Sequence, residues 1–171
     1  MSESFKLEKK IRIAVLTVSD TRTPETDAGG ALVKSMAEAE GIEVAGYRIV
    51  KDDEAAIKEV VLEWLGDSEL DAIISTGGTG IAKRDVSIEA IGPLFDKEMA
   101  GFGELFRYLS FSEDIGTRAL LSRASAGVAA DKALFVLPGS RGAVKLAMDR
   151  LILPELAHII FELGKHRQTR S

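Results

Sequence analysis

Residues 71–85 read Asp71-Ala-Ile-Ile-Ser-Thr-Gly-Gly-Thr-Gly80-Ile-Ala-Lys-Arg-Asp85, and this stretch decides the fold. Its apolar run at 72–74 has the length and branching of a buried strand. The run leads into three glycines within four residues, and a carboxylate closes the loop just before a helical pattern. Glycine adopts positive φ without steric cost, and successive N–H groups ahead of a helix bind anions. We therefore predict a strand, an anion-binding loop and a helix, with Lys83, Arg84 and Asp85 on the rim of the loop.

The loop by itself leaves a simpler interpretation open, because many glycine-rich strand-to-helix turns only change the chain direction. A P-loop requires Gly-x-x-x-x-Gly-Lys-[Ser/Thr], and no Lys-Ser or Lys-Thr follows the last glycine. A dinucleotide fingerprint requires Gly-x-Gly-x-x-Gly with an acidic residue about 20 positions later, whereas the order here is Gly-Gly-Thr-Gly. An anion site at this loop therefore belongs to neither class.

Outside this stretch, apolar patterns alternate between strand and helix. Strands are predicted at Ile11–Val18, Val44–Val50, Ala72–Ile74 and Ala133–Leu137. Helices are predicted from the N-cap Asp27 to Gly41, from Lys51-Asp-Asp53 to Gly66, at Ser87–Asp96, at Phe102–Phe111 and in a long final region with a kink or restart at Pro154. This order is typical of an α/β fold with a doubly wound, mostly parallel sheet and helices on both faces.

Four polar loops each follow a predicted strand. They are Ser19–Thr23, Lys51–Asp53, Thr76–Asp85 and Pro138–Arg141. Crossovers between parallel strands are right-handed, so the carboxyl ends of these strands share one edge of the sheet. Ligands of such sheets bind at that edge. We therefore expect the four loops to form one site.

Aspartates at this edge suggest a metal–nucleotide ligand. Asp20, Asp52, Asp53 and Asp85 all lie in the four loops. Carboxylates beside an anion seat repel the anion unless a cation lies between them, and Mg²⁺ commonly takes one or two carboxylates plus phosphate oxygens. The alternative for each aspartate before a helix is simple capping. Ser140 has the same two interpretations: a hydrogen bond to a ligand, or the N-cap of the final helical region.

Composition indicates a single globular domain over residues 1–171, with frayed ends at 1–9 and 167–171. The chain is 46% hydrophobic and 29% charged and carries a net charge of −5, which argues against nucleic acid as a partner. Its apolar stretches are shorter than a membrane span, residues 1–10 lack a signal peptide's apolar core, and there is no cysteine for disulfides or thiolate metal sites. We expect a cytoplasmic protein without a membrane partner.

Four ordered motifs resemble one known family. They are Ser75-Thr-Gly-Gly-Thr-Gly80 with Arg84-Asp-Val86, Glu98-Met-Ala-Gly-Phe-Gly-Glu-Leu-Phe-Arg107, Leu121-Ser-Arg-Ala-Ser-Ala-Gly127 and Leu137-Pro-Gly-Ser140. Together they are similar to the molybdenum cofactor biosynthesis protein B (MoaB) family, which is related to the molybdopterin adenylyltransferases. The resemblance spans roughly residues 10–165. Ala100 stands where that family usually has proline.

The resemblance implies a three-layer α/β/α fold that assembles as a trimer or a dimer of trimers. It also implies a site for molybdopterin and Mg·ATP, in which the terminal phosphate of molybdopterin attacks the α-phosphate and pyrophosphate leaves. Asp52 and Asp85 match the family's catalytic and Mg²⁺-binding aspartates. The predicted substrate-binding residues are Ser19, Asp20, Thr76, Gly77, Gly78, Thr79, Gly80, Arg84, Glu104, Pro138, Gly139 and Ser140.

Three functions remain open at this point. The first is an adenylyltransferase acting on molybdopterin, which the presence of Asp52, Asp85 and Ser140 favours. The second is a molybdopterin-binding or scaffold protein without turnover, since the MoaB branch includes such members. The third is an α/β domain with an unrelated anion ligand. The apolar stripe of Phe102–Phe111 and the final helix predict a homo-oligomer, and other proteins of the same pathway form a further class of partner.

Overall fold

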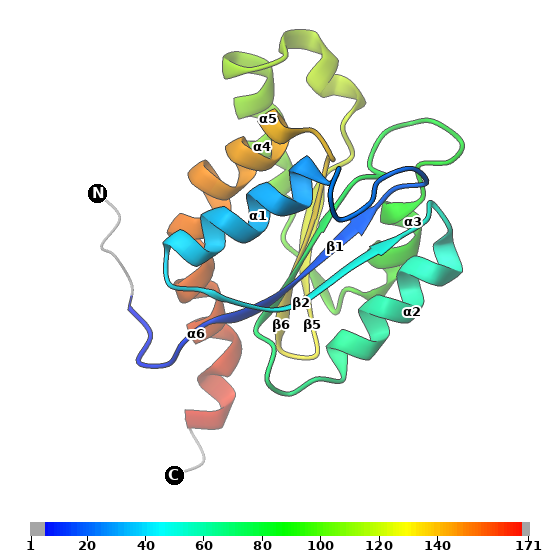
Figure 1. Ribbon diagram of the computed structural model, residues 1–171. Helices are drawn as coiled ribbons and strands as arrows, with labels where there is room; N and C mark the ends of the chain where they lie inside the picture. Colours follow the sequence, from blue (N-terminus) through cyan, green and yellow to red (C-terminus); the bar gives the residue numbers. More distant parts are fainter. Residues whose placement is uncertain (1–5, 169–171) are drawn as a thin grey trace.

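The short apolar runs of the sequence form the strands of one central sheet (Figure 1). The computed structural model describes residues 6–168. The strands lie in the order β2-β1-β3-β6-β5-β4. Their bounds are Arg12–Val18 for β1, Glu43–Val50 for β2, Ala72–Thr76 for β3, Lys97–Glu98 for β4, Ser125–Ala129 for β5 and Lys132–Leu137 for β6. The first four in spatial order are parallel, and β5 and β4 are antiparallel.

Helices cover both faces of this sheet, so the predicted three-layer α/β/α arrangement with a mostly parallel sheet is confirmed. In Figure 1, α1, α5 and α6 lie on one side of the strands, and α2 and α3 lie on the other. The helices are α1 Ala28–Ala39, α2 Glu54–Leu65, α3 Ser87–Ile91, α4 Ala100–Glu113, α5 Arg141–Ala147 and α6 Leu153–Gln168. Short 3-10 segments follow at Gly92–Leu94 and Gly116–Leu121, and a π-helical segment at Met148–Ile152 joins α5 to α6.

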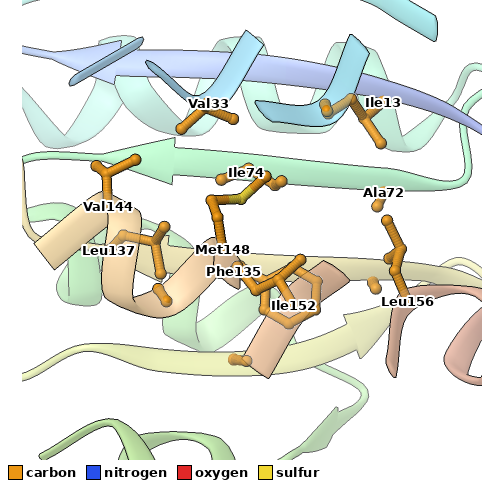
Figure 2. Packing of buried hydrophobic residues seen from close by; sticks show 14 of the residues in the cluster. Ile13, Val33, Ala72, Ile74, Phe135, Leu137, Val144, Met148, Ile152 and Leu156 are labelled. Atoms are coloured by element: carbon orange, nitrogen blue, oxygen red, sulfur yellow. The ribbon is translucent and has the colours of Figure 1, made fainter. Parts of the chain in front are cut away.

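The sheet residues alternate between two hydrophobic clusters. On one face, Ile74 and Phe135 pack with Met148 and Ile152, as Figure 2 shows. On the other face, Ile73 and its neighbours pack against the apolar stripe of α2. Each fully buried aliphatic or aromatic side chain contributes roughly 1.5–3 kcal/mol by leaving water. Both faces of the central strands are therefore closed, and the loops at the strand ends are what remain available for ligands.

Two parts of the predicted element order were wrong. The strands β4 and β5 were not predicted, because β5 consists mostly of small residues and lacks the β-branched run that indicates a strand. Gly127 of β5 is packed against the Phe95 ring, where a Cβ atom would come within 2.4 Å of the ring. The predicted helix Ser87–Asp96 is shorter, since α3 ends at Ile91 and a 3-10 turn containing Pro93 follows.

The predicted kink or helix restart at Pro154 is confirmed, because the π-helical segment ends at Ile152 and α6 begins at Leu153, directly before the proline. Of the predicted frayed ends, residues 1–5 and 169–171 lie outside the described residues. Within the described part, Lys9 forms an ion pair with Asp71, and Arg167 pairs with Asp131 at 3.1 Å.

Candidate functional site

The four predicted loops meet at the carboxyl edge of the sheet. Ser19 N–H donates to Val50 O at 2.8 Å, which joins the end of β1 to the end of β2. Gly77 N–H donates to Leu137 O at 2.8 Å, which joins the end of β3 to the end of β6. The chain crosses from β1 outward to β2 and then back to β3, so the loops after β1 and β3 flank the topological switch point of the sheet.

The glycine-rich loop after β3 requires its glycines for close packing. Gly77 has φ of +94°, and a Cβ atom there would lie 2.3 Å from Val18 O. Gly78 has φ of +73° and packs against Ser87, whose hydroxyl donates to Gly77 O at 2.7 Å. Any side chain at Gly77 would force the loop away from β1. Gly77 thus brings the loop close to β1, while Gly78–Gly80 line a pocket.

A pocket of about 310 Å³ lies between this loop and the turn after β6. The sequence-predicted residues that line it are Gly78, Thr79, Gly80, Asp85, Pro138, Gly139 and Ser140. The hydroxyl oxygen of Ser140 accepts from Ala143 N–H at 3.2 Å, so Ser140 caps α5 while its own proton is available to a ligand. Both interpretations of Ser140 are therefore compatible with the structure.

Asp85 lines the pocket, and the carboxylates of Asp20 and Asp52 lie near enough to influence one another and Asp85. Asp52 N–H donates to Asp20 Oδ1 at 3.0 Å. Burial raises the pKa of the Asp52 carboxyl above its ordinary value, the nearby charge of Asp20 raises it further, and Arg84 opposes the shift while Asp85 adds to it. Asp20, Asp52, Arg84 and Asp85 are thus within electrostatic reach of one another. None of the ion pairs in residues 6–168 involves these aspartates.

Among the aspartates of the four loops, helix capping explains only Asp53. Asp53, not Asp52, caps α2, since its carboxylate accepts from Ala56 N–H at 2.8 Å. Asp85 does not cap α3 either, because its Oδ2 accepts from Ala82 N–H at 2.9 Å within the loop. Capping therefore accounts for Asp53 and does not account for the charges of Asp52 and Asp85.

The donor set fits a magnesium ion that arrives with a phosphate ligand. Within residues 6–168 there is no group of three or more histidine, cysteine or acidic side chains arranged to hold a metal ion. Mg²⁺ is commonly held by only one or two carboxylates, with phosphate oxygens and water completing the shell. Burial and the charge of Asp20 raise the pKa of Asp52, and a bound cation would relieve the repulsion between the two carboxylates. Asp52 and Asp85 would be the protein ligands.

Several predicted residues lie away from the pocket lining. The Thr76 side chain is buried, and its hydroxyl lies 3.4 Å from that of Thr17 inside the protein. Ser19 Oγ accepts the N–H groups of its own turn at 3.1 and 3.2 Å. Glu104 lines a separate pocket of about 600 Å³ beside β5, together with Arg107 and Arg123.

Sequence reasoning missed one wall of the 310 Å³ pocket. The pocket is also lined by Ser110 of α4, by Asp114 directly after α4, and by Leu121 and Ser122. These residues do not follow a parallel strand, so the expectation that ligands bind at the carboxyl ends of parallel strands did not predict them. The available signal was the motif Leu121-Ser-Arg-Ala-Ser-Ala-Gly127, which contains Leu121 and Ser122 but neither Ser110 nor Asp114.

The sequence model of a family described as "Probable molybdopterin binding domain" matches residues 14–158. The molybdenum cofactor biosynthesis protein B of Staphylococcus carnosus (strain TM300) is 60% identical over 164 residues, covering 95% of this chain and 96% of that protein. The chain belongs to the molybdenum cofactor biosynthesis protein B family. It is therefore a molybdenum cofactor biosynthesis protein with a molybdopterin-binding domain.

Solved structures agree with this assignment to the MoaB family. A crystal structure of a molybdenum cofactor biosynthesis protein B is 52% identical and superposes with a TM-score of 0.90, covering 95% of this chain and 100% of that one. The tungsten cofactor synthesizing protein MoaB of Pyrococcus furiosus is 36% identical with a TM-score of 0.81, covering 92% and 99%. Among residues 6–168, no helix combines the length and hydropathy that a membrane crossing needs.

Proposed function

We propose that this MoaB-family protein binds molybdopterin and Mg·ATP and transfers the adenylyl group to molybdopterin in the cytoplasm. In this reaction a terminal phosphate oxygen of molybdopterin forms a bond to the α-phosphorus of ATP, the bond between the α- and β-phosphates breaks, and pyrophosphate leaves. The observation that carries the proposal is the group formed by Asp20, Asp52 and Asp85. These carboxylates have no ion pair among the described residues and lie beside a glycine-rich loop at the ligand edge of the sheet.

The residues of the chain supply positioning and charge. The loop Gly78–Gly80 and the turn Pro138–Ser140 both line the pocket and would hold the phosphate-bearing substrates there. Magnesium, bound by Asp52 and Asp85 together with phosphate oxygens, would neutralise charge on the reacting phosphates. The hydroxyl of Ser140 can donate to a phosphate oxygen because its acceptor side already binds Ala143 N–H. No covalent step on the protein is required.

A binding protein without turnover is the second candidate. It is favoured by one contact, because Oδ2 of Asp85 already accepts from Ala82 N–H and thereby holds its own loop. In that case the site would retain molybdopterin for a later enzyme of the same pathway.

Pyrophosphate release from ATP in the presence of molybdopterin and Mg²⁺ distinguishes the two functions. We expect release by the unchanged protein and a loss on the order of 10²–10³-fold in Asp85→Asn, with molybdopterin still bound. The asparagine oxygen can still accept from Ala82 N–H, so the loop keeps its internal contact. Asp53→Asn is the matched control, because an asparagine caps α2 equally well and should leave turnover unchanged.

Tight molybdopterin binding without pyrophosphate release by the unchanged protein would establish the binding function instead. Equal turnover in Asp85→Asn and in the unchanged protein would remove Asp85 from the reaction. Failure to bind molybdopterin at all would contradict both candidates.

Self-association belongs to the same proposal, with a trimer or a dimer of trimers as the expected state. Large apolar side chains are exposed along α4 and the 3-10 segment after it, including Tyr108 at 66%, Phe111 at 55% and Leu120 at 86%. An apolar surface of this kind is typical of a protein interface. The final helix, which the sequence also suggested for this role, instead buries Leu156 and Ile160 in the core.

Sedimentation tests the interface directly. Replacing Leu120 by glutamate should shift the protein toward a monomer, because a charge would be placed in the apolar contact. The control is Leu62→Glu, since Leu62 is 47% exposed on α2 at the other face of the sheet. A monomeric unchanged protein at micromolar concentration would contradict the proposed assembly. Contacts with other proteins of the pathway stay a prediction.

A further inference from the structure

Arg123 contacts the middle and the end of the glycine-rich loop, which runs from Thr76 to Asp85. Its backbone N–H donates to Thr79 O at 3.0 Å, and its Nε donates to Gly80 O at 2.9 Å. Its Nη2 donates to Asp85 O at 3.1 Å. One residue thus joins Thr79 and Gly80, which line the pocket, to the aspartate that ends the loop.

The remaining side of the guanidinium group is held by α3. Nη1 of Arg123 binds the carboxylate of Glu89 in an ion pair, and Nη2 lies 3.4 Å from the second oxygen of that carboxylate. This contact lowers the pKa of Glu89 below its ordinary value, so the pair remains charged at neutral pH. Arg123 is therefore fixed from one side by Glu89 and fixes the loop on the other side.

We propose that Arg123 is the positioning residue that sets the place of the Asp85 carboxylate relative to the loop amides. The inference rests on the proposed function of the site, because it assigns Arg123 a role in that reaction. Arg123 does not line the 310 Å³ pocket but belongs to the adjoining pocket of about 600 Å³ beside β5. It acts on the substrates only through the loop.

The chemistry of this position requires arginine. A guanidinium group has five N–H donors in a fixed planar fork, and here Nε and Nη2 reach two different carbonyl groups while Nη1 reaches a carboxylate. A lysine ammonium is a single charged point on a flexible stem, so it cannot hold Gly80 O and Asp85 O apart at a defined spacing.

Arg123 is expected to affect the loop far more than global stability. Its side chain is 34% exposed and that of Glu89 is 43% exposed, and ion pairs at this exposure contribute little to stability. Few other contacts hold the loop in place. The other hydrogen bonds that the structure shows for residues 80–84 join Ala82 to Asp85 within the loop itself. Loss of Arg123 should release the loop while the core persists.

The test compares Arg123→Ala and Arg123→Lys with the matched control Arg48→Ala. Arg48 forms a similar two-pronged pair with Glu63, at 2.7 and 2.9 Å, that does not involve the loop. Two readouts are measured: amide hydrogen exchange of residues 79–86 without any ligand, and pyrophosphate release as kcat and KM for ATP. Thermal unfolding is recorded for all variants.

In Arg123→Ala we expect loss of exchange protection at the amides of Ala82 and Asp85, which donate the hydrogen bonds of residues 79–86. We also expect a fall in kcat on the order of 10²-fold, with a smaller change in KM. Free guanidinium ion at millimolar concentration should restore part of both, and Arg123→Lys should not. Arg48→Ala should change neither readout, and unfolding temperatures of the Arg123 and Arg48 variants should agree.

Unchanged exchange of residues 79–86 in Arg123→Ala would overturn the inference, as would full activity in that variant. If the unchanged protein releases no pyrophosphate, the proposed function fails. In that case the exchange measurement still decides whether Arg123 holds the loop, because it needs no substrate.

Discussion

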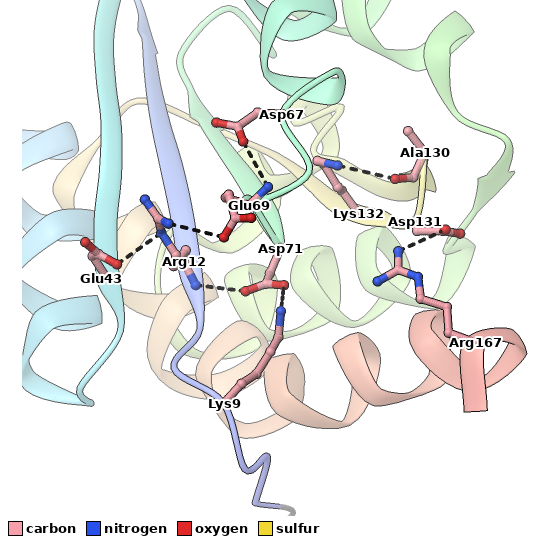
Figure 3. A network of polar contacts seen from close by, with 10 residues as sticks. All are labelled: Lys9, Arg12, Glu43, Asp67, Glu69, Asp71, Ala130, Asp131, Lys132 and Arg167. Atoms are coloured by element: carbon pink, nitrogen blue, oxygen red, sulfur yellow. Dashed lines mark hydrogen bonds and ion pairs between the residues drawn. The ribbon is translucent and has the colours of Figure 1, made fainter. Parts of the chain in front are cut away.

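The two edges of the parallel sheet both carry acidic side chains but treat them in opposite ways. At the amino edge, the carboxylate of Asp71 pairs with Lys9 and accepts from Arg12 N–H at 2.9 Å, and Arg12 in turn pairs with Glu43 at 3.0 Å (Figure 3). At the carboxyl edge, Asp52 and its neighbouring aspartates have no cation paired with them in residues 6–168, and repulsion between them raises the pKa of Asp52 beyond the effect of burial. The fold neutralises charge at one edge and leaves it exposed to a ligand at the other.

The two edges also differ in which residues occupy backbone positions with positive φ. At the carboxyl edge, glycines occupy the left-handed positions, with φ of +94° at Gly77 and +73° at Gly78. At the amino edge, the β5–β6 turn places Ala130 at +50° and Asp131 at +60°, where glycine or asparagine would be favoured. At the carboxyl edge, glycines therefore relieve backbone strain, but the aspartates are not paired with cations. At the amino edge, the acidic side chains are paired with cations, but the β5–β6 turn is strained.

The largest effect is expected from removing Asp71, whose ion pair and hydrogen bond lie at the amino edge. Asp71→Ala should lower the free energy of unfolding by about 2–3 kcal/mol, because Asp71 is buried and its loss leaves Arg12 N–H without this acceptor. Urea unfolding measures it, with Arg167→Ala as the control, because this substitution breaks the exposed pair with Asp131 and about 0–1 kcal/mol is expected. Equal losses in both variants would contradict the view that burial makes Asp71 important.

The second prediction concerns the carboxyl edge and has the opposite sign. Asp52→Asn should raise the free energy of unfolding at neutral pH, on the order of 0.5–2 kcal/mol, because it removes a charge that burial and Asp20 disfavour. The folded pKa is raised, so the unchanged protein loses stability as pH rises from the ordinary value of 3.8 through the folded value.

The advantage of Asp52→Asn should therefore disappear in acid, where Asp52 is protonated in the unchanged protein as well. Unfolding measured across this pH range checks the sign. A destabilised Asp52→Asn at neutral pH would mean that the carboxyl edge is compensated after all, and the comparison of the two edges would fail. Pyrophosphate release by the same variant should fall.

A third prediction sharpens the backbone contrast. Ala130→Gly should stabilise the protein by about 0.5–1 kcal/mol, since relief of the left-handed strain exceeds the entropy that glycine loses on folding. Thermal unfolding measures the gain, and turnover should not change because the turn lies at the edge away from the site. A loss of stability would show that the turn is not strained.

The smallest expected effect concerns the strand beneath the glycine-rich loop. Ser75 is 1% exposed, and its hydroxyl oxygen has no hydrogen-bond partner among the described residues. Ser75→Ala should change the free energy of unfolding by roughly 0–1 kcal/mol in the stabilising direction. A clear destabilisation would show that the hydroxyl is paired in solution.

Much of the carboxyl edge could be predicted from sequence because its residues follow parallel strands. Gly78, Asp85 and Ser140 are far apart in the chain, yet the rule that parallel strands share their carboxyl edge brings their loops together. The wall formed by Ser110 and Ser122 could not be found in this way, because Ser110 lies on a helix and Ser122 lies in the segment before β5, and neither follows a parallel strand. For the same reason Glu104, which the family resemblance assigned to the site, lines a different pocket.

The sequence by itself determined the alternation of strands and helices, the parallel order that it implies and the loops that carry polar residues, since hydrophobic period and glycine placement are local properties. Only the tertiary structure decided that, of two adjacent aspartates, Asp53 caps a helix while Asp52 lies near Asp20 and Asp85. It also decided that Arg123, from the segment before β5, holds the loop after β3. These outcomes depend on distances between segments far apart in the chain, and no local pattern encodes such distances.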